Sequence, residues 1–159
     1  MSFTYPVGTR GARQPTNRMS LWMNDRTARR LRRTGGGKFM GMDALVLNTV
    51  GRKSGQRRAS PLGWFPGEPD GWIVIAAAAG ATHNPAWYFN AAAHPDGLTI
   101  DLAGQTIPVT ARELHGTERA AAWTRITTAV PRFAADQKKT DRELPVILLE
   151  RREASADAP

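Results

Sequence analysis

Residues 44–79 decide the fold, and they read ALVLNTV-GRKSGQ-RRASPLGWF-PGEPDG-WIVIAAAA. Three runs rich in apolar and β-branched residues, 44–50, 57–65 and 72–79, are separated by short segments rich in Gly, Pro and polar residues. Such runs predict strands. The short connections favour antiparallel pairing, because parallel strands need a crossover of a dozen residues or more. The stretch therefore predicts an antiparallel sheet.

The chain after this stretch mixes strands and helices without regular β-α-β alternation. Asn84 as N-cap and Pro85 at the first helical position predict a helix over 86–93. The other expected elements are a hairpin of 98–102 and 106–114, a helix from the N-cap Thr117 to about Val130, a short polar helix or loop up to Arg142, and a buried strand at 144–150. About six strands and three or four helices predict an α+β domain on a closed or partly closed antiparallel barrel.

The segment before the sheet is predicted to be an arm followed by a helix. Residues 1–15 are rich in Pro, Gly and Arg, which predicts a flexible arm. A helix is expected from Thr16 or Asn17 to about Arg33, where three glycines end it. The expected divisions are 1–37 for the basic arm and helix, 38–150 for the barrel and 151–159 for a polar tail.

Positive charge is concentrated near the N-terminus. The 159 residues carry 22 Lys and Arg against 14 Asp and Glu, a formal net charge of +8. Residues 1–58 hold 13 of these cations and only Asp25 and Asp43. This asymmetry indicates an anionic partner, either nucleic acid, an anionic membrane surface or a small polyanion. Nucleic acid is the least favoured, because the aromatic residues are not interleaved with the cations as in a stacking platform.

Several classes of chemistry are excluded. There is no cysteine, so disulfides and thiolate metal sites are absent. His83, His94 and His115 lack metal-ligand spacing, so no metal site is expected. Gly37-Lys38 does not lie in a P-loop pattern. The sequence contains no motif of hydrolytic side chains, so an enzyme would take its reactive group from a cofactor.

The sequence also bears on localisation. No apolar run reaches the ~20 residues of a membrane span. The N-terminus lacks the apolar stretch of a secretory signal. A cytoplasmic protein is therefore expected, with membrane association open only through the basic N-terminal segment, whose Trp22 lies on the apolar side of the expected helix.

Residues 51–58, Gly-Arg-Lys-Ser-Gly-Gln-Arg-Arg, connect two of the expected strands. Glycine lets the backbone approach a ligand closely, and exposed N–H groups in such turns form anion-binding nests. Arginine adds bidentate contacts to phosphate or carboxylate. The segment is thus either an anion cradle or a solvated basic hairpin turn, and its spacing leaves both open.

Small residues mark a second candidate. Residues 76–81 read AAAAGA and run from a strand end toward a helix that carries Trp87 and Tyr88. Small side chains leave room for a flat ligand, and a helix N-terminus offers N–H groups. Tight packing explains the small residues equally well, and the two aromatic residues can be core residues.

These motifs, in this order, resemble the deazaflavin-dependent nitroreductase family of actinobacterial oxidoreductases. The resemblance spans about residues 30–150. Its motifs are 47–55 (LNTVGRKSG), Arg58 with Pro61-Leu62, 79–81 (AGA) with Asn84-Pro85, Trp87-Tyr88 and Asn90, and 140–142 (TDR) with Pro145-Val146. It implies a split β-barrel that binds coenzyme F420, an 8-hydroxy-5-deazaflavin with a phosphate and a polyglutamate tail. It also implies hydride transfer from the reduced ring to a hydrophobic, electron-poor substrate such as a quinone, an enone or a nitro compound.

The resemblance further implies a set of binding residues. Those expected to hold the phosphate and tail are Arg52, Lys53, Ser54, Gly55, Gln56, Arg57 and Arg58. Those expected to lie against or near the ring are Leu47, Asn48, Thr49, Pro61, Ile75, Ala76, Ala77, Ala78, Ala79 and Trp87. The expected substrate contacts are Tyr88, Val130 and Phe133. No catalytic side chain and no metal is expected.

The sequence departs from the family pattern near the expected ring. Ala77 and Ala78 stand where many relatives carry serine and lysine. Val130, Phe133, Asp136 and Lys139 stand where a well-known nitroreductase of the family has several tyrosines. The alternatives to an F420-dependent reductase are a non-catalytic F420-binding protein, a peripheral membrane-binding protein, or a split barrel that binds FMN.

Overall fold

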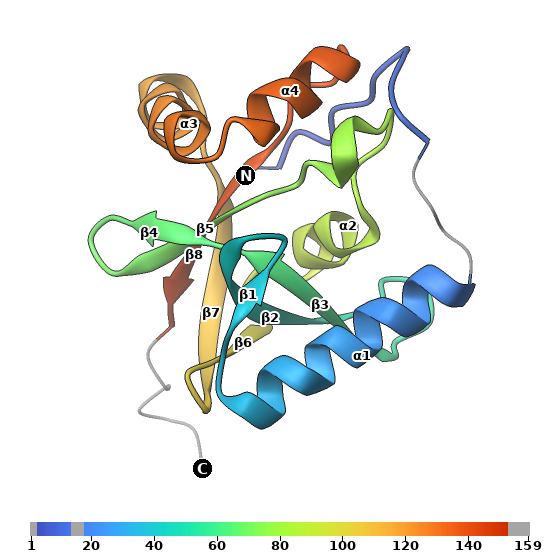
Figure 1. The fold of residues 1–159 in the computed structure, drawn as a ribbon, viewed down its shortest axis with the longest axis vertical. Coiled ribbons are helices and arrows are strands. Elements are labelled where there is room, and N and C mark those ends of the chain that lie inside the picture. The colour runs from blue at the N-terminus through green and yellow to red at the C-terminus, as the bar shows by residue number, and fades with distance from the viewer. Residues whose placement is uncertain (1–2, 14–17, 153–159) are drawn as a thin grey trace.

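The computed structural model describes residues 3–13 and 18–152 (Figure 1). Its elements are α1 (Arg18–Thr34), β1 (Lys38–Phe39), β2 (Met42–Val50), β3 (Arg57–Gly63), β4 (Phe65–Gly67), β5 (Gly71–Ile75), the 3-10 helix η1 (Ala78–Gly80), α2 (Ala86–Ala93), β6 (Leu98–Leu102), β7 (Gln105–Glu113), α3 (Gly116–Ala129), α4 (Arg132–Lys139) and β8 (Val146–Arg151). The predicted α+β class is confirmed. The described residues form eight strands rather than about six, because 57–67 divides into β3 and β4 and the short β1 precedes β2.

The eight strands form one curled sheet in the order β1-β2-β6-β7-β8-β5-β4, with β3 paired to β2. All pairings between these strands are antiparallel, as the short connections predict. The sheet bends around α2 into a half-barrel, which Figure 1 shows from the side of α1. The sheet thus forms the split barrel that the resemblance implies.

Strand β2 is central because both of its faces are covered. Leu45 and Leu47 face the inside of the half-barrel, where they pack with α2. Ala44 and Val46 face outward, where Ala28 and Leu31 of α1 cover them. A strand buried on both faces reads as a continuous apolar run, which is why residues 44–47 show no alternation. A further apolar cluster lies between the sheet and the helices α3 and α4.

Two expected helix caps are wrong. Pro85 rather than Asn84 is the N-cap of α2, and no side chain caps that helix. The buried Asn84 amide instead accepts a hydrogen bond from Arg142 and donates one to the Pro6 carbonyl. His115 rather than Thr117 is the N-cap of α3. The other expected caps, Thr16 and Asn17, lie outside the described residues.

The N-terminal segment is not a free arm where the structure describes it. Phe3 is buried in the main core, in edge-to-face contact with Tyr88. The N–H groups of Gly8 and Ala12 donate to the carbonyls of Thr82 and Gly80, each at 2.9 Å. The prediction of a flexible arm failed for residues 3–13 because these hydrogen bonds and the burial of Phe3 join segments far apart in the sequence.

Candidate functional site

The basic turn (residues 51–58) consists of the hairpin connection 51–56 between β2 and β3 and of Arg57 and Arg58, the first two residues of β3. The Gly51 N–H donates to the Gln56 carbonyl at 2.7 Å, and the Gly55 N–H donates to the Gly51 carbonyl at 2.8 Å. The Ser54 hydroxyl accepts from the Gln56 N–H at 3.2 Å. Gly55 has φ +70°, a left-handed conformation that glycine adopts without strain. The backbone of the turn is thus held by its own hydrogen bonds.

Helix α2 fixes one end of the basic turn. The Arg52 N–H donates to the side-chain oxygen of the buried Asn90 at 3.1 Å, and the Asn90 amide donates to the Thr49 hydroxyl at 3.3 Å. The Arg52 guanidinium lies over the Phe89 ring, 4.6 Å from its centre. Such stacking leaves the edge of the guanidinium free to donate hydrogen bonds.

The cations of the basic turn are available to an external anion. Arg52, Lys53, Arg57 and Arg58 are all exposed. Within residues 3–13 and 18–152, none of the four forms a salt bridge. Four unpaired cations around a glycine-containing turn match the chemistry of a phosphate or carboxylate site.

The alanine turn (residues 76–81) follows β5, where the sequence predicts that the strand continues to Ala79. The strand ends at Ile75 instead, and beyond it Ala78 and Ala79 adopt the left-handed region with φ +47° and +54°. Gly80 continues the turn with φ +80°. Left-handed φ values cost a non-glycine residue roughly 1–2 kcal/mol each, so the surrounding structure must impose them.

Arg142 holds the backbone on both sides of Ala78 and Ala79, and the Ala12 N–H also donates to the Gly80 carbonyl. Arg142 is 1% exposed, and its guanidinium donates to the carbonyls of Ala76 at 2.9 Å, Ala77 at 2.8 Å and Ala81 at 2.9 Å. It also donates to the Asn84 side-chain oxygen at 2.5 Å. Burial lowers the pKa of Arg142 to about 10, so the side chain stays charged at neutral pH. The expected site omitted Arg142, and its only sequence signal was the TDR motif of the resemblance.

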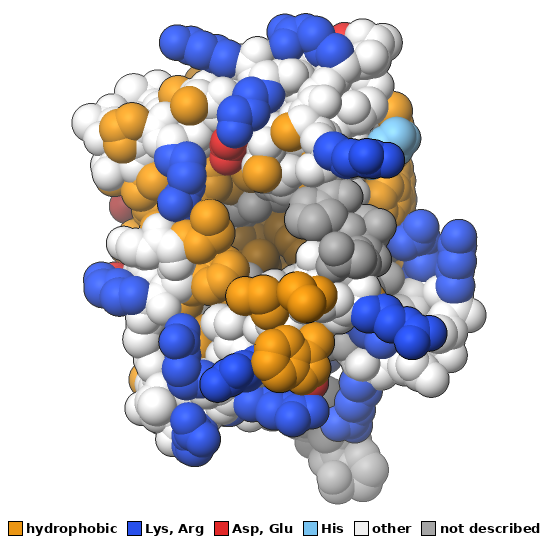
Figure 2. Space-filling model, turned by 45° about the vertical axis from the view of Figure 1, so that its right-hand side comes forward, with side chains coloured by type: hydrophobic (Ala, Val, Ile, Leu, Met, Phe, Trp, Pro, Cys, Tyr) orange, Lys and Arg blue, Asp and Glu red, His pale blue; other side chains and the backbone are white. Residues whose placement is uncertain are grey.

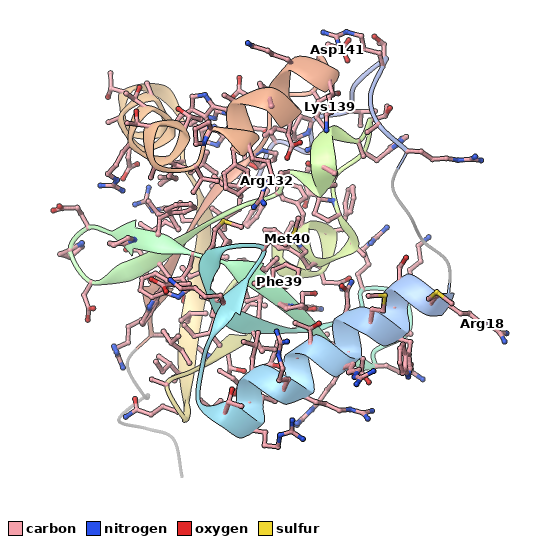
Figure 3. The ribbon with its side chains drawn as sticks, in the orientation of Figure 1. Arg18, Phe39, Met40, Arg132, Lys139 and Asp141 are labelled. Atoms are coloured by element: carbon pink, nitrogen blue, oxygen red, sulfur yellow. The ribbon has the colours of Figure 1, made fainter. Side chains whose placement is uncertain are left out.

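A hollow opens in the face above the N-terminal half of α1 (Figure 2). Hydrophobic side chains form its floor, and α1 and α4 lie on opposite sides of it. Arg132 of α4 points toward Met40 in the β1–β2 turn (Figure 3) and donates to the Met40 carbonyl at 3.1 Å. Met40 is exposed and Phe39 is half-buried. The hollow thus offers apolar surface beside a cation.

A separate groove of about 810 Å³ lies on the other side of α1, against β6. Four of the expected cofactor residues line it: Asn48, Thr49, Arg57 and Arg58. At its floor the Asp101 carboxylate accepts hydrogen bonds from Asn48 and Thr106 and pairs with Arg32. Although burial raises the pKa of Asp101, these contacts lower it below its ordinary value. The groove is polar, unlike the hollow.

The remaining expected residues are mostly buried. Leu47, Ala76 and Trp87 belong to the main core, while Ile75 and Ala77 face the cluster under α3 and α4. Pro61 is buried on β3, and Ala78 and Ala79 carry the exposed surface of the alanine turn. The structure therefore does not gather all the ring residues on one open surface.

The three expected substrate residues are divided between two clusters. Tyr88 is fully buried, and its hydroxyl donates to Glu113 at 2.5 Å. Burial and this hydrogen bond raise the pKa of Tyr88. Phe133 and Val130 lie in the cluster under α3 and α4, and only Val130 is half-exposed.

Two absences concern residues 3–13 and 18–152, the described part of the chain. Within it, no group of three His, Cys, Asp or Glu side chains could hold a metal ion. No helix within it is both long and apolar enough to cross a membrane.

A curled antiparallel half-barrel with an unpaired basic turn defines a small split-barrel protein equipped to bind an anionic ligand. The chain belongs to the F420H(2)-dependent quinone reductase family, whose profile matches residues 21–151. The resemblance expected from the motifs is thereby confirmed, and with it the dependence on coenzyme F420.

Individual relatives agree with this assignment. The Mycobacterium tuberculosis protein Rv3178 is 35% identical over 117 residues, which cover 74% of this chain and 97% of that protein. The F420H(2)-dependent quinone reductase Rv1261c of the same species is 30% identical over 112 residues, covering 69% of this chain and 74% of its own. A solved F420-H2 dependent reductase (FDR-A) has a TM-score of 0.59 and 36% identity, covering 67% of this chain and 93% of that one. A structure described as a domain-swapped dimer has a TM-score of 0.60 and 33% identity, covering 83% of this chain and 99% of that one.

Proposed function

We propose that this protein is an F420H2-dependent reductase that transfers a hydride to a quinone. The observation that carries the proposal is the basic turn, whose four cations are exposed and unpaired in a chain of this family. Reduction of other electron-poor acceptors, such as enones and nitro compounds, belongs to the same chemistry and is tested in the same assay.

The chain's own residues fit an anionic deazaflavin. The phosphate and tail would be held by the basic turn through Arg52, Lys53, Ser54, Gly55, Gln56, Arg57 and Arg58. A methyl group built on Gly55 meets no atom within 4 Å, so the turn has open space at that point. The ring would be flanked by 47–49, Pro61, 75–79 and Trp87, where Ala79 is exposed and Ala78 is half-buried, so that a flat group can approach.

The chemistry needs little from protein side chains. When bound, the reduced deazaflavin supplies a hydride, and the quinone takes up this hydride and a proton to become the quinol. The basic turn would bind and orient the cofactor, and the hydrophobic floor of the hollow would exclude water from the acceptor. We assign Tyr88, Val130 and Phe133 to the substrate side. Of these, Val130 presents the most surface.

We also propose that α1 contacts an anionic membrane surface. Met19, Leu21, Trp22 and Met23 are exposed by 57–69%. Six arginines and a single acidic residue, Asp25, lie on the same helix. Apolar side chains flanked by cations are typical of helices that lie in a membrane interface. No contact with nucleic acid is proposed.

Vesicle sedimentation tests the membrane contact. The wild-type protein should sediment with vesicles that contain anionic lipid and remain in the supernatant with zwitterionic ones. The double variant Trp22→Ser, Met23→Ser should lose this binding, whereas Val7→Ser, which removes an exposed apolar residue outside α1, should keep it. Equal recovery of all three proteins from anionic vesicles would reject the proposal.

The reductase activity is tested by following oxidation of F420H2 with a panel of quinones, enones and nitroarenes. Turnover with at least one quinone is expected, and it should require the reduced deazaflavin. Binding without turnover on the whole panel would favour a non-catalytic F420-binding protein. Turnover with reduced FMN alone would favour an FMN-dependent split barrel.

A further inference from the structure

Arg142 is a buried cation whose described hydrogen-bond acceptors are all uncharged oxygens. Its four acceptors are three backbone carbonyls of the alanine turn and the side-chain oxygen of Asn84. No salt bridge within the described part of the chain includes it. Because no described carboxylate pairs with it, the positive charge of Arg142 favours an anionic group nearby.

The acidic side chains closest in sequence bind other partners. Asp141 accepts hydrogen bonds from the Thr9 N–H at 2.7 Å and from the Thr9 hydroxyl at 2.5 Å. Glu143 pairs with Arg119 at 3.0 Å. An anion on the other side of the alanine turn therefore has no competitor among these carboxylates for the charge of Arg142.

Arg142 also orients the peptide groups of the turn. A trans peptide points its N–H opposite to its carbonyl. Since the carbonyls of Ala76 and Ala77 point at Arg142, the N–H groups of Ala77 and Ala78 point away from it. Ala78 and Ala79 carry the exposed surface of the turn, and the N–H groups of Ala77–Ala79 have no acceptor among residues 3–13 and 18–152.

We propose that Arg142 is a positioning residue for the deazaflavin ring, which this inference takes from the proposed function. It directs peptide N–H groups of the alanine turn toward a ring oxygen. Its buried charge favours the ionised form of the ring. Lysine at this position would keep the charge but could not reach three carbonyls and an amide at once, because only the guanidinium carries a planar fork of five donors.

Binding to two ligands tests the proposal. Oxidised coenzyme F420 and the tail-less deazaflavin ring compound, which lacks the phosphate and glutamates, are titrated against the wild type, Arg142→Gln, Arg142→Lys and Lys53→Ala. Tryptophan fluorescence gives the dissociation constants, and the absorption spectrum of each bound ring at one fixed pH reports its ionised fraction. Thermal unfolding shows which variants are folded.

The variants should distinguish the contribution of the alanine turn from that of the basic turn. Arg142→Gln should weaken binding of both ligands about tenfold and reduce the ionised fraction of the bound ring. Arg142→Lys should weaken binding of both but retain the ionised fraction. Lys53→Ala should weaken binding of the complete coenzyme only, because the tail-less compound does not reach the basic turn.

Arg119→Lys is the matched control. Arg119 donates to the Leu144 carbonyl at 2.8 Å and so supports the same chain segment, but it makes no described contact with the alanine turn, and lysine keeps a cation beside Glu143. This substitution should lower stability without changing either dissociation constant. If Arg142→Gln does not fold, Arg142→Lys carries the test. Folded Arg142 variants with wild-type affinity for both ligands would overturn the proposal, whereas a wild type that binds neither ligand would overturn the proposed function itself.

Discussion

The basic turn and the alanine turn, the two halves of the proposed cofactor site, are built in opposite ways. The basic turn is exposed, charged and held by hydrogen bonds among its own residues 51–56. The alanine turn is uncharged, and it is held by Arg142, more than 60 residues further along the chain. Substitutions in the basic turn should therefore lower the affinity for the cofactor and leave the fold stable. Substitutions in the alanine turn should lower both the stability of the fold and the affinity.

The largest expected effect lies in the alanine turn. A methyl group on Gly80 would lie 2.6 Å from the Asp136 carbonyl, at φ +80°. Left-handed strain and overpacking together predict that Gly80→Ala lowers the free energy of unfolding by about 2–4 kcal/mol. Denaturant unfolding measures the change. A loss below ~1 kcal/mol would mean that the turn adapts freely.

A smaller effect is expected on affinity at the basic turn. Lys53→Ala should weaken F420 binding by about 1–3 kcal/mol, because it removes a charge-assisted contact. Its free energy of unfolding should change by less than about 0.5 kcal/mol, since the side chain is exposed and unpaired. Fluorescence titration gives the affinity. Lys138→Ala, an exposed lysine of α4, should leave affinity unchanged, and an equal loss there would point to general electrostatic attraction.

Gly55→Ala sharpens the comparison with Gly80. Gly55 also has a positive φ, +70°, but a methyl group there meets no atom within 4 Å. Only the conformational cost remains, so stability should fall by roughly 1 kcal/mol. A loss as large as that of Gly80→Ala would show that the basic turn is packed rather than open.

The smallest effect concerns acid pH. Hydrogen bonds from the Thr9 hydroxyl and N–H lower the pKa of Asp141 to about 2, below its ordinary value near 3.9. A depressed pKa stabilises the folded protein above the unfolded pKa, and this contribution is lost as pH falls toward 2. The difference in Tm between wild type and Asp141→Asn should be constant above pH 5 and shrink below pH 4. A difference in Tm that does not depend on pH would contradict the hydrogen bonds between Asp141 and the N-terminal segment.

The elements that the sequence predicts well have local causes. The β2–β3 hairpin, α2 and the β6–β7 hairpin follow from apolar runs, turn residues and proline, and the observed boundaries lie within a few residues of those expected. The basic turn is recognisable for the same reason, because its glycines and cations are adjacent in sequence. Its position at one end of α2 depends on Asn90, which no local pattern reveals.

The features that the sequence does not predict are decided by distant contacts. Residues 76–79 have the composition of a strand end, yet the carbonyls of Ala76 and Ala77 turn toward Arg142 and end β5. Asn84 has the sequence context of an N-cap, but Arg142 and Pro6 take both ends of its amide. Residues 3–13 have the composition of a flexible arm, but Phe3 fills a place in the core. Each of these features can be predicted only when the residue that makes the distant contact is known.

Titration of the purified protein with coenzyme F420, followed by tryptophan fluorescence, is the most direct test of the site. The protein should bind the coenzyme saturably in the micromolar range or tighter, and it should bind the tail-less ring compound more weakly because the basic turn is then unused. Saturable binding of FMN with no binding of either deazaflavin would contradict the account.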